Sequence, residues 1–424
     1  MSSSAATAPR LGFLTEPVDS QQVSPGWKKL FLLLHCGLFI PYITDAIPSL
    51  YGLELFPIRP AIFMLVLCML NAACVLSKGL DYTKTSILLI LFLGFRAFDI
   101  AILQRFLYPD GQGEALFSTL ALILTATIAA TSLGVTRRTF SLPLLLVSGS
   151  SIVIQAASVL LEFAGLIKLS TVPGRAAGFA GDSNDSCMMM NLMLGVFLTL
   201  NRNFWLNLAM ILVTALGVLP TLSRGGMLIL ILIAGMFFLL NLRKHATKLL
   251  LSAAAFIPIA GIMVGILVNS TNNGGVVDQN AKKRIEAIFG GDMENMQSDE
   301  RMKDLQDGID AATAHPLTGL GTGAGSLKYQ PHNQLVTLWI ELGLSGPILF
   351  LALLASAAFK VLQARGKGIY ILIPLVLYIP LAQTLLEKYA YLYSLLILFY
   401  YTSSHFYAFR LARLPTQSTS CPQS

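Results

Sequence analysis

The sequence predicts an all-α polytopic membrane protein with about 12 transmembrane helices and one large, partly helical outer loop. The chain of 424 residues is 55% hydrophobic and only 12% charged, whereas soluble domains carry about 25% charged residues. Its apolar residues come in blocks of roughly 20, the length of a helix that crosses about 30 Å of hydrocarbon. Because these blocks do not alternate between apolar and polar residues, they indicate helices and not the strands of a membrane β-barrel.

The predicted spans divide the chain into a polar tail (1–27), nine spans (28–268), an outer loop (269–331), three further spans (332–409) and a second tail (410–424). The first tail lacks a small-residue cleavage site after an apolar stretch, so it is not interpreted as a signal peptide. Approximate boundaries of the spans are 28–47, 58–76, 84–103, 115–134, 142–166, 185–200, 203–221, 226–242, 248–268, 333–358, 368–386 and 389–409.

Lysine and arginine set the predicted orientation. If the N-terminus is cytoplasmic, every inner loop is basic, as around Arg137, Arg138 and Arg243. The positive-inside rule then places both termini in the cytoplasm. The net charge of +7 follows this rule and does not come from a basic soluble domain, so no nucleic-acid partner is predicted.

Some basic residues lie on the outer side, against this bias, and three arginines among them are singled out. Arg175 and Arg224 fall in short outer loops, and Arg301 falls in the large one. Two explanations remain open. The arginines either pair with nearby acids such as Asp182 and Glu341, or they bind an anionic ligand at the outer membrane surface.

The outer loop is predicted to contain two helices. Residues 278–289 have the pattern of a short basic amphipathic helix. The second helix has Ser298 as its N-cap, acidic residues in its first turn and Pro316 after its end. Arg301 lies in that first turn, beside backbone N–H groups that also bind anions.

Four glycines at every second position, from Gly319 to Gly325, follow this helix. They let the backbone approach either a ligand or a neighbouring helix closely. As a phosphate-binding loop the pattern is weak, because it lacks the Lys-Ser/Thr ending of a P-loop. A compact connection is therefore the favoured alternative.

His332 and Asn333 lie where the chain re-enters the membrane. An isolated histidine is usually structural, but one at this boundary titrates near neutral pH and is a candidate general base. Glu341 lies about two turns deeper in the same predicted helix. A carboxylate inside a membrane is by default part of a functional site or of a polar network.

Seven short stretches from the outer side carry a family resemblance. They are Arg175-Ala-Ala-Gly178, Asp182-Ser-Asn184, Ser223-Arg-Gly-Gly226, Ser298-Asp-Glu-Arg301, His315-Pro-Leu-Thr-Gly-Leu-Gly-Thr-Gly323, His332-Asn-Gln-Leu335 and Glu341-Leu-Gly-Leu-Ser-Gly346. In order and spacing they resemble the superfamily of O-antigen ligases and polymerases, and most of all the lipopolysaccharide O-antigen ligases. One minor departure is Glu300, where the family usually has a small residue.

The resemblance implies a glycosyltransferase of the bacterial inner membrane whose active site faces the periplasm. Such an enzyme moves an O-antigen glycan from an undecaprenyl-diphosphate-linked donor to a sugar of the lipid A–core acceptor. Its expected partners are this donor, this acceptor and the surrounding membrane lipid. His332 would be the base, and Arg175 and Arg301 would bind the diphosphate. A single displacement inverts the anomeric centre. No metal motif is visible in the sequence, so no metal and no other cofactor are expected.

Five further residues are predicted to bind substrate: Arg224, Asn333, Asp182, Asn184 and Glu341. Arg224 has a second interpretation, in which it ties two helix ends together.

Other functions are compatible with the sequence. An O-antigen or exopolysaccharide polymerase of the same superfamily is the main alternative, and a protein oligosaccharyltransferase is a further one. The ligase is favoured because the outer loop is compact and the chain is close to ligase length. A secondary transporter would show internal repeats with broken helices in matching positions, and none is visible.

Overall fold

The computed structural model describes residues 25–58, 84–98, 142–171, 175–242, 298–364 and 367–411, with single positions at 62, 63, 66, 69, 70, 123, 127, 246 and 247. All regular secondary structure in these residues is helical. The predicted span at 248–268, most of the spans at 58–76 and 115–134, and the predicted helix at 278–289 lie outside them.

Most of the described helices lie within or beside predicted spans. The longer ones are α1 (Pro25–Ile43), α2 (Ala46–Gly52), α4 (Lys84–Phe98), α7 (Leu142–Phe163), α8 (Ser183–Leu200), α9 (Phe204–Val218), the helix Arg224–Leu242, α12 (Ser298–Ala314), α13 (Gln334–Leu342), α14 (Ser345–Ala364), α15 (Ile369–Leu377) and α16 (Tyr389–Leu411). Short turns are η3 (Gly178–Ala180), η4 (Leu219–Thr221), η5 (Gly325–Tyr329) and η6 (Leu385–Glu387).

Apolar length identifies the membrane-spanning helices. Within the described residues, four helices are long and apolar enough to cross a membrane: Leu142–Phe163, Phe204–Thr221, Arg224–Leu242 and Ser345–Gln363. The pair Lys29–Ile43 and Ala46–Gly52, bent by 61°, makes a fifth if it is one broken span. The predicted class of helical membrane protein is confirmed, while the count of about 12 stays a prediction.

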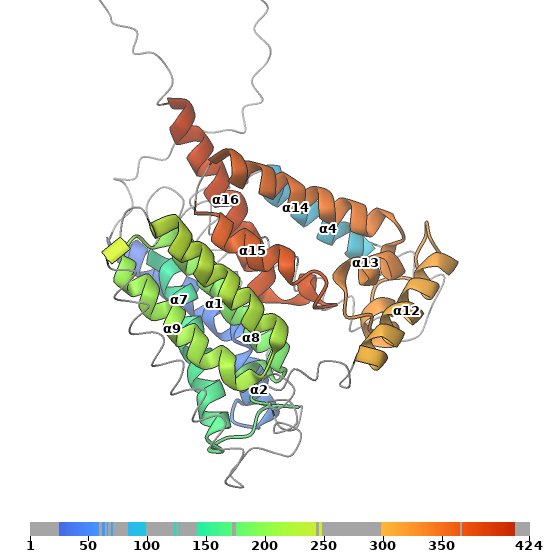
Figure 1. The fold of residues 1–424 in the computed structure, drawn as a ribbon, viewed down its shortest axis with the longest axis horizontal. Helices are drawn as coiled ribbons and strands as arrows, with labels where there is room; N and C mark the ends of the chain where they lie inside the picture. The colour runs from blue at the N-terminus through green and yellow to red at the C-terminus, as the bar shows by residue number, and fades with distance from the viewer. Residues whose placement is uncertain are drawn as a thin grey trace, which may run out of the picture.

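Helix α8 lies at the centre of the bundle. It packs against α7, α9, α15 and α16, and its residues from Ser186 to Thr199 are all buried. A helix that is apolar on every side needs such a central place. In Figure 1, α1, α7, α8 and α9 lie side by side, and α15 and α16 separate them from α14, α4, α13 and α12.

Two predicted spans are interrupted. The span at 333–358 consists of α13 and α14, separated at Gly343, whose φ is +64°. A side chain there would meet the Leu317 carbonyl oxygen at 2.2 Å, so only glycine fits. The span at 368–386 stops at Leu377, because Pro380 cannot continue a helix and disfavours helical geometry in the residue before it. Residues 378–388, called here the 378–388 segment, contain only η6.

The connections gather at two ends of the bundle. At one end, Lys367 Nζ donates to the Asn201 carbonyl at 3.1 Å. At the other, the Ser49 hydroxyl donates to the Phe179 carbonyl, and Lys388 pairs with Asp185. This grouping agrees with the predicted inner and outer loops, and the orientation itself stays a prediction.

Candidate functional site

Three of the motif stretches meet around Arg175. Its Nε donates to the Thr221 carbonyl at 3.0 Å, and its Nη2 donates to Asn184 Oδ1 at 3.1 Å. The Ser223 hydroxyl donates to the same Asn184 oxygen at 2.9 Å. We call Arg175, Asn184, Thr221 and Ser223 the Arg175 cluster. Arg175 is only 9% exposed and its guanidinium has two fixed acceptors, so its orientation is set before any ligand arrives.

Glu162, at the end of α7, holds the chain that carries Arg175. Its carboxylate accepts hydrogen bonds from the backbone N–H groups of Leu169, Ser170, Ala177 and Gly178. These donors lie on both sides of Arg175, so one buried carboxylate closes the whole turn. This role of Glu162 was not predicted from the sequence, although a glutamate at the end of an apolar span is the signal for it.

Asp182 caps α8. Its Oδ1 accepts from the backbone N–H groups of Asn184 at 2.7 Å and Asp185 at 3.3 Å, as a helix N-cap does. Asp185 in turn pairs with Lys388 Nζ at 2.5 Å, which joins α8 to the start of α16. The predicted substrate-binding residues Asp182 and Asn184 therefore have structural partners, and Lys388 is a charged residue of this region that the sequence analysis did not single out.

Arg224 lies next to the Arg175 cluster in sequence but differs from Arg175 in its environment. It is exposed and begins the helix Arg224–Leu242. The residue two positions before it, Leu222, has a left-handed φ of 55°. This conformation is costly for a branched side chain, and such strain is concentrated at functional sites.

His332 lies in a strained turn just before α13. Its φ is 49°, and that of Gln330 is 45°. The His332 backbone N–H donates to Gln383 Oε1 at 3.3 Å, and Asn333 caps α13 through the N–H groups of Leu335 and Val336. A histidine held in left-handed conformation by its surroundings points to a functional constraint.

The charges around His332 bring distant motifs together. Partial burial lowers the pKa of the imidazole, because the charged ring is disfavoured there, and the positive charge of Arg301 lowers it further. Asp304 and Asp182 act on this pKa in the opposite direction. Residues from α12, from the N-terminus of α8 and from the start of α13 therefore share one electrostatic environment. A neutral imidazole in it can accept a proton.

The glycine-rich stretch packs on the end of α13. The Leu320 N–H donates to the Ile340 carbonyl at 2.6 Å, and the Gly321 N–H donates to the Glu341 carbonyl at 3.0 Å. A side chain at Gly319, where φ is +70°, would lie 2.4 Å from the same Glu341 oxygen. These amides satisfy carbonyl groups that a helix leaves unpaired at its end. Of the two alternatives, the structure supports the compact connection.

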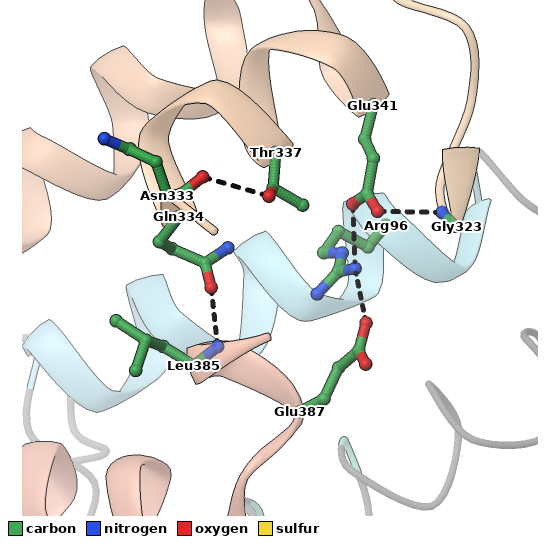
Figure 2. Close-up of polar contacts among 8 residues, drawn as sticks. All are labelled: Arg96, Gly323, Asn333, Gln334, Thr337, Glu341, Leu385 and Glu387. Atoms are coloured by element: carbon green, nitrogen blue, oxygen red, sulfur yellow. Dashed lines mark hydrogen bonds and ion pairs between the residues drawn. The ribbon is translucent and has the colours of Figure 1, made fainter. Parts of the chain in front are cut away.

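Glu341 is fully buried and bound on both oxygens. Arg96 Nη2 of α4 donates to Oε2 at 3.0 Å, and the Gly323 N–H donates to Oε1 at 2.9 Å. The same Arg96 nitrogen lies 3.5 Å from Glu387 Oε1 (Figure 2). The structure thus gives Glu341, predicted to bind substrate, a place in a buried ionic network. Arg96 and Glu387, which complete the network, were not singled out from the sequence.

This is a helical membrane protein with a histidine and several fixed polar turns gathered at one end of its bundle. Residues 208–351 match a family model described as O-Antigen ligase. The match confirms the predicted resemblance to the O-antigen ligase superfamily, over a segment that includes Ser223, Arg301, His332 and Glu341. No curated protein matches the chain significantly.

No group of three potential metal ligands from histidine, cysteine, aspartate and glutamate occurs in the part of the chain that the structure describes. Metal-independent chemistry stays a prediction.

Proposed function

We propose that the protein is a periplasmic-facing glycosyltransferase of the inner membrane. It transfers an O-antigen glycan from undecaprenyl diphosphate to a sugar of the lipid A–core. The observation that carries this proposal is the environment of His332. His332 lies in a strained turn before α13, and burial and the charge of Arg301 lower its pKa. Asp182, the N-cap of the helix that carries Asn184 of the Arg175 cluster, also acts on this pKa. This arrangement suits a general base beside a binding site for phosphate groups.

The proposed reaction is a single displacement. His332 takes the proton of the acceptor hydroxyl, whose oxygen attacks the anomeric carbon of the donor. The bond between this carbon and the diphosphate oxygen breaks, and the lipid diphosphate leaves with the electron pair. One such step inverts the anomeric centre.

The developing charge on the diphosphate needs fixed donors. Guanidinium groups form paired hydrogen bonds with phosphate oxygens, and Arg175 and Arg301 are assigned to this task. Arg224, which follows Ser223 of the Arg175 cluster, is assigned to substrate contact, and so is the amide nitrogen of Asn333, whose Oδ1 caps α13. Asp182, Asn184 and Glu341 are assigned indirect roles, because their side-chain oxygens bind backbone or arginine N–H groups of the protein.

The test is a transfer reaction with purified protein, an undecaprenyl-diphosphate-linked glycan and a lipid A–core acceptor. We expect His332→Ala to lower the rate by about 10² to 10⁴, the usual contribution of a positioned base. Donor binding should stay close to that of the wild-type protein. The matched control is His315→Ala, which removes an exposed histidine at the end of α12. Equal activity of the two variants would eliminate His332 as the base.

The same assay separates the alternatives. Extension of the glycan without a lipid A–core acceptor would identify a polymerase. Activity that survives complete chelation by EDTA would support metal-independent transfer, whereas a loss restored by Mg²⁺ would overturn it. Absence of transfer with every acceptor would overturn the proposed function.

A further inference from the structure

Three hydrogen bonds join the turn that carries His332 to the 378–388 segment, about 50 residues further along the chain. The His332 N–H binds Gln383, the Gln334 N–H donates to the Ile379 carbonyl at 2.9 Å, and Gln334 Oε1 accepts from the Leu385 N–H at 2.6 Å. All three bonds connect the start of α13 with the 378–388 segment. Since this segment has only one short turn of its own, its shape depends on what holds it.

The second connection lies at the other end of α13, in the ionic network of Figure 2. Arg96 contacts Glu341 on α13 and Glu387 on the 378–388 segment with a single nitrogen, Nη2. Arg96 is 3% exposed and Glu341 is fully buried. Charges buried this deeply are strongly disfavoured without their partners, so Arg96 and Glu341 constrain each other's place.

Arg96 comes from a third element, α4, which also packs against α14 and α16. Its charge on an apolar helix is costly in a membrane and is explained by the two carboxylates that it joins. The network thus ties α4, α13 and the 378–388 segment together, and the glycine-rich stretch joins it through Gly323.

We propose that Arg96 is a positioning residue for glycan transfer. By pairing with Glu341 and Glu387, it fixes the 378–388 segment against α13, and this segment places His332. The inference rests on the proposed function, in which His332 is the base. Arg96 itself touches no substrate in this scheme.

The first measurement is hydrogen–deuterium exchange of the full chain in detergent, which does not depend on activity. Glu387→Gln removes the charge of the less buried carboxylate, whose side chain is 35% accessible, and leaves the buried pair intact. Arg96→Gln combined with Glu341→Gln removes both buried charges together, so no lone charge remains. Both variants should show faster exchange at the amides of His332, Gln334 and Leu385. The amides bound by Glu162 serve as an internal reference and should be unchanged.

The second measurement is the transfer rate of the same variants. A displaced base lowers kcat more than it changes donor binding, so we expect a loss of kcat of about tenfold or more with a nearly constant donor KM. Arg96→Lys keeps a positive charge and a donor, and both pairings use one nitrogen, so it should restore much of the rate. Glu54→Gln is the matched control, because it makes the same chemical change at an exposed site.

The outcomes separate this inference from the proposed function. Unchanged exchange in both network variants overturns the inference, and so does faster exchange with wild-type kcat. The inference is also overturned if the network variants lose activity without faster exchange and Arg96→Lys is no more active than they are. A wild-type protein that transfers no glycan overturns the proposed function and the inference with it.

Discussion

The Arg175 cluster and helix α12 hold their arginines in opposite ways. Arg175 is nearly buried, and its Nε and Nη2 each donate to an oxygen of a neighbouring element. Glu162 closes the turn around it. Arg301 instead lies exposed on the first turn of α12, where its charge influences His332. The guanidinium of Arg175 thus has a fixed orientation, whereas the position of Arg301 is set mainly by the helix that carries it.

This difference defines what each arginine can contribute. A guanidinium held before the ligand arrives stabilises developing charge without reorganising. An exposed guanidinium acts more through its charge and is screened by salt. The shape of the side chain should therefore matter at position 175, and the sign of its charge at position 301.

The largest expected effect is at Arg175. Replacement by alanine should lower kcat/KM by about 10² to 10³, the range found when one fixed donor to developing charge is lost. Arg175→Lys should be almost as damaging, since an ammonium group cannot reproduce the forked contacts to Thr221 and Asn184. Initial rates and donor binding measure both. Full activity of Arg175→Lys would show that the fork is unnecessary and would remove the contrast with Arg301.

The sequence predicted both arginines and some of the elements that carry them, but not the contrast between them. Local signals predicted the helix that bears Arg301 and its end before Pro316, because capping residues and prolines act on their neighbours. The sequence also indicated the three motifs around Arg175, Asn184 and Ser223 and placed them on one side of the membrane, but it did not predict that they contact one another. The family match confirms the resemblance that these motifs indicated over part of the chain.

The rest depends on contacts between residues far apart in the chain. Arg96 and Glu341 are 245 positions apart, and no local pattern pairs them. Gln383 and Lys388 lay in or beside predicted spans, so their roles became visible only where α15 stops and the chain leaves helical geometry. An arginine inside an apolar span was the one available signal, and it marks a polar network without naming its partners.

A smaller effect is expected at Arg301. Arg301→Ala should lower kcat/KM by about tenfold, because an exposed charge contributes less than a buried one. Arg301→Lys should stay close to the wild-type rate, in contrast to Arg175→Lys. Rates at low and high salt test this further, since the advantage of arginine over alanine should shrink as salt rises. A lysine variant at position 301 as damaged as alanine would mean that Arg301 also binds through its shape.

The smallest effect is a shift in the pH dependence of transfer. A base must be neutral to accept a proton, so the rate should fall at acid pH as His332 becomes charged. The pKa that sets this fall lies below its ordinary value, mainly through burial and partly through Arg301. Arg301→Ala removes a charge that disfavours the imidazolium, so the acid limb should move to higher pH. It should still stay below the position for an exposed histidine, because burial remains.

Asp304 gives this experiment a matched counterpart on the same helix. Its negative charge raises the pKa of His332. Asp304→Asn should therefore move the acid limb to lower pH, opposite to the shift in Arg301→Ala. The measurement is kcat/KM against pH for the two variants and the wild-type protein, since this ratio reports groups of the free enzyme. Shifts in the same direction, or none in either variant, would mean that the titrating group is not an imidazole beside α12. The exposed arginine would then act on the donor alone, and the two regions would differ in binding strength only.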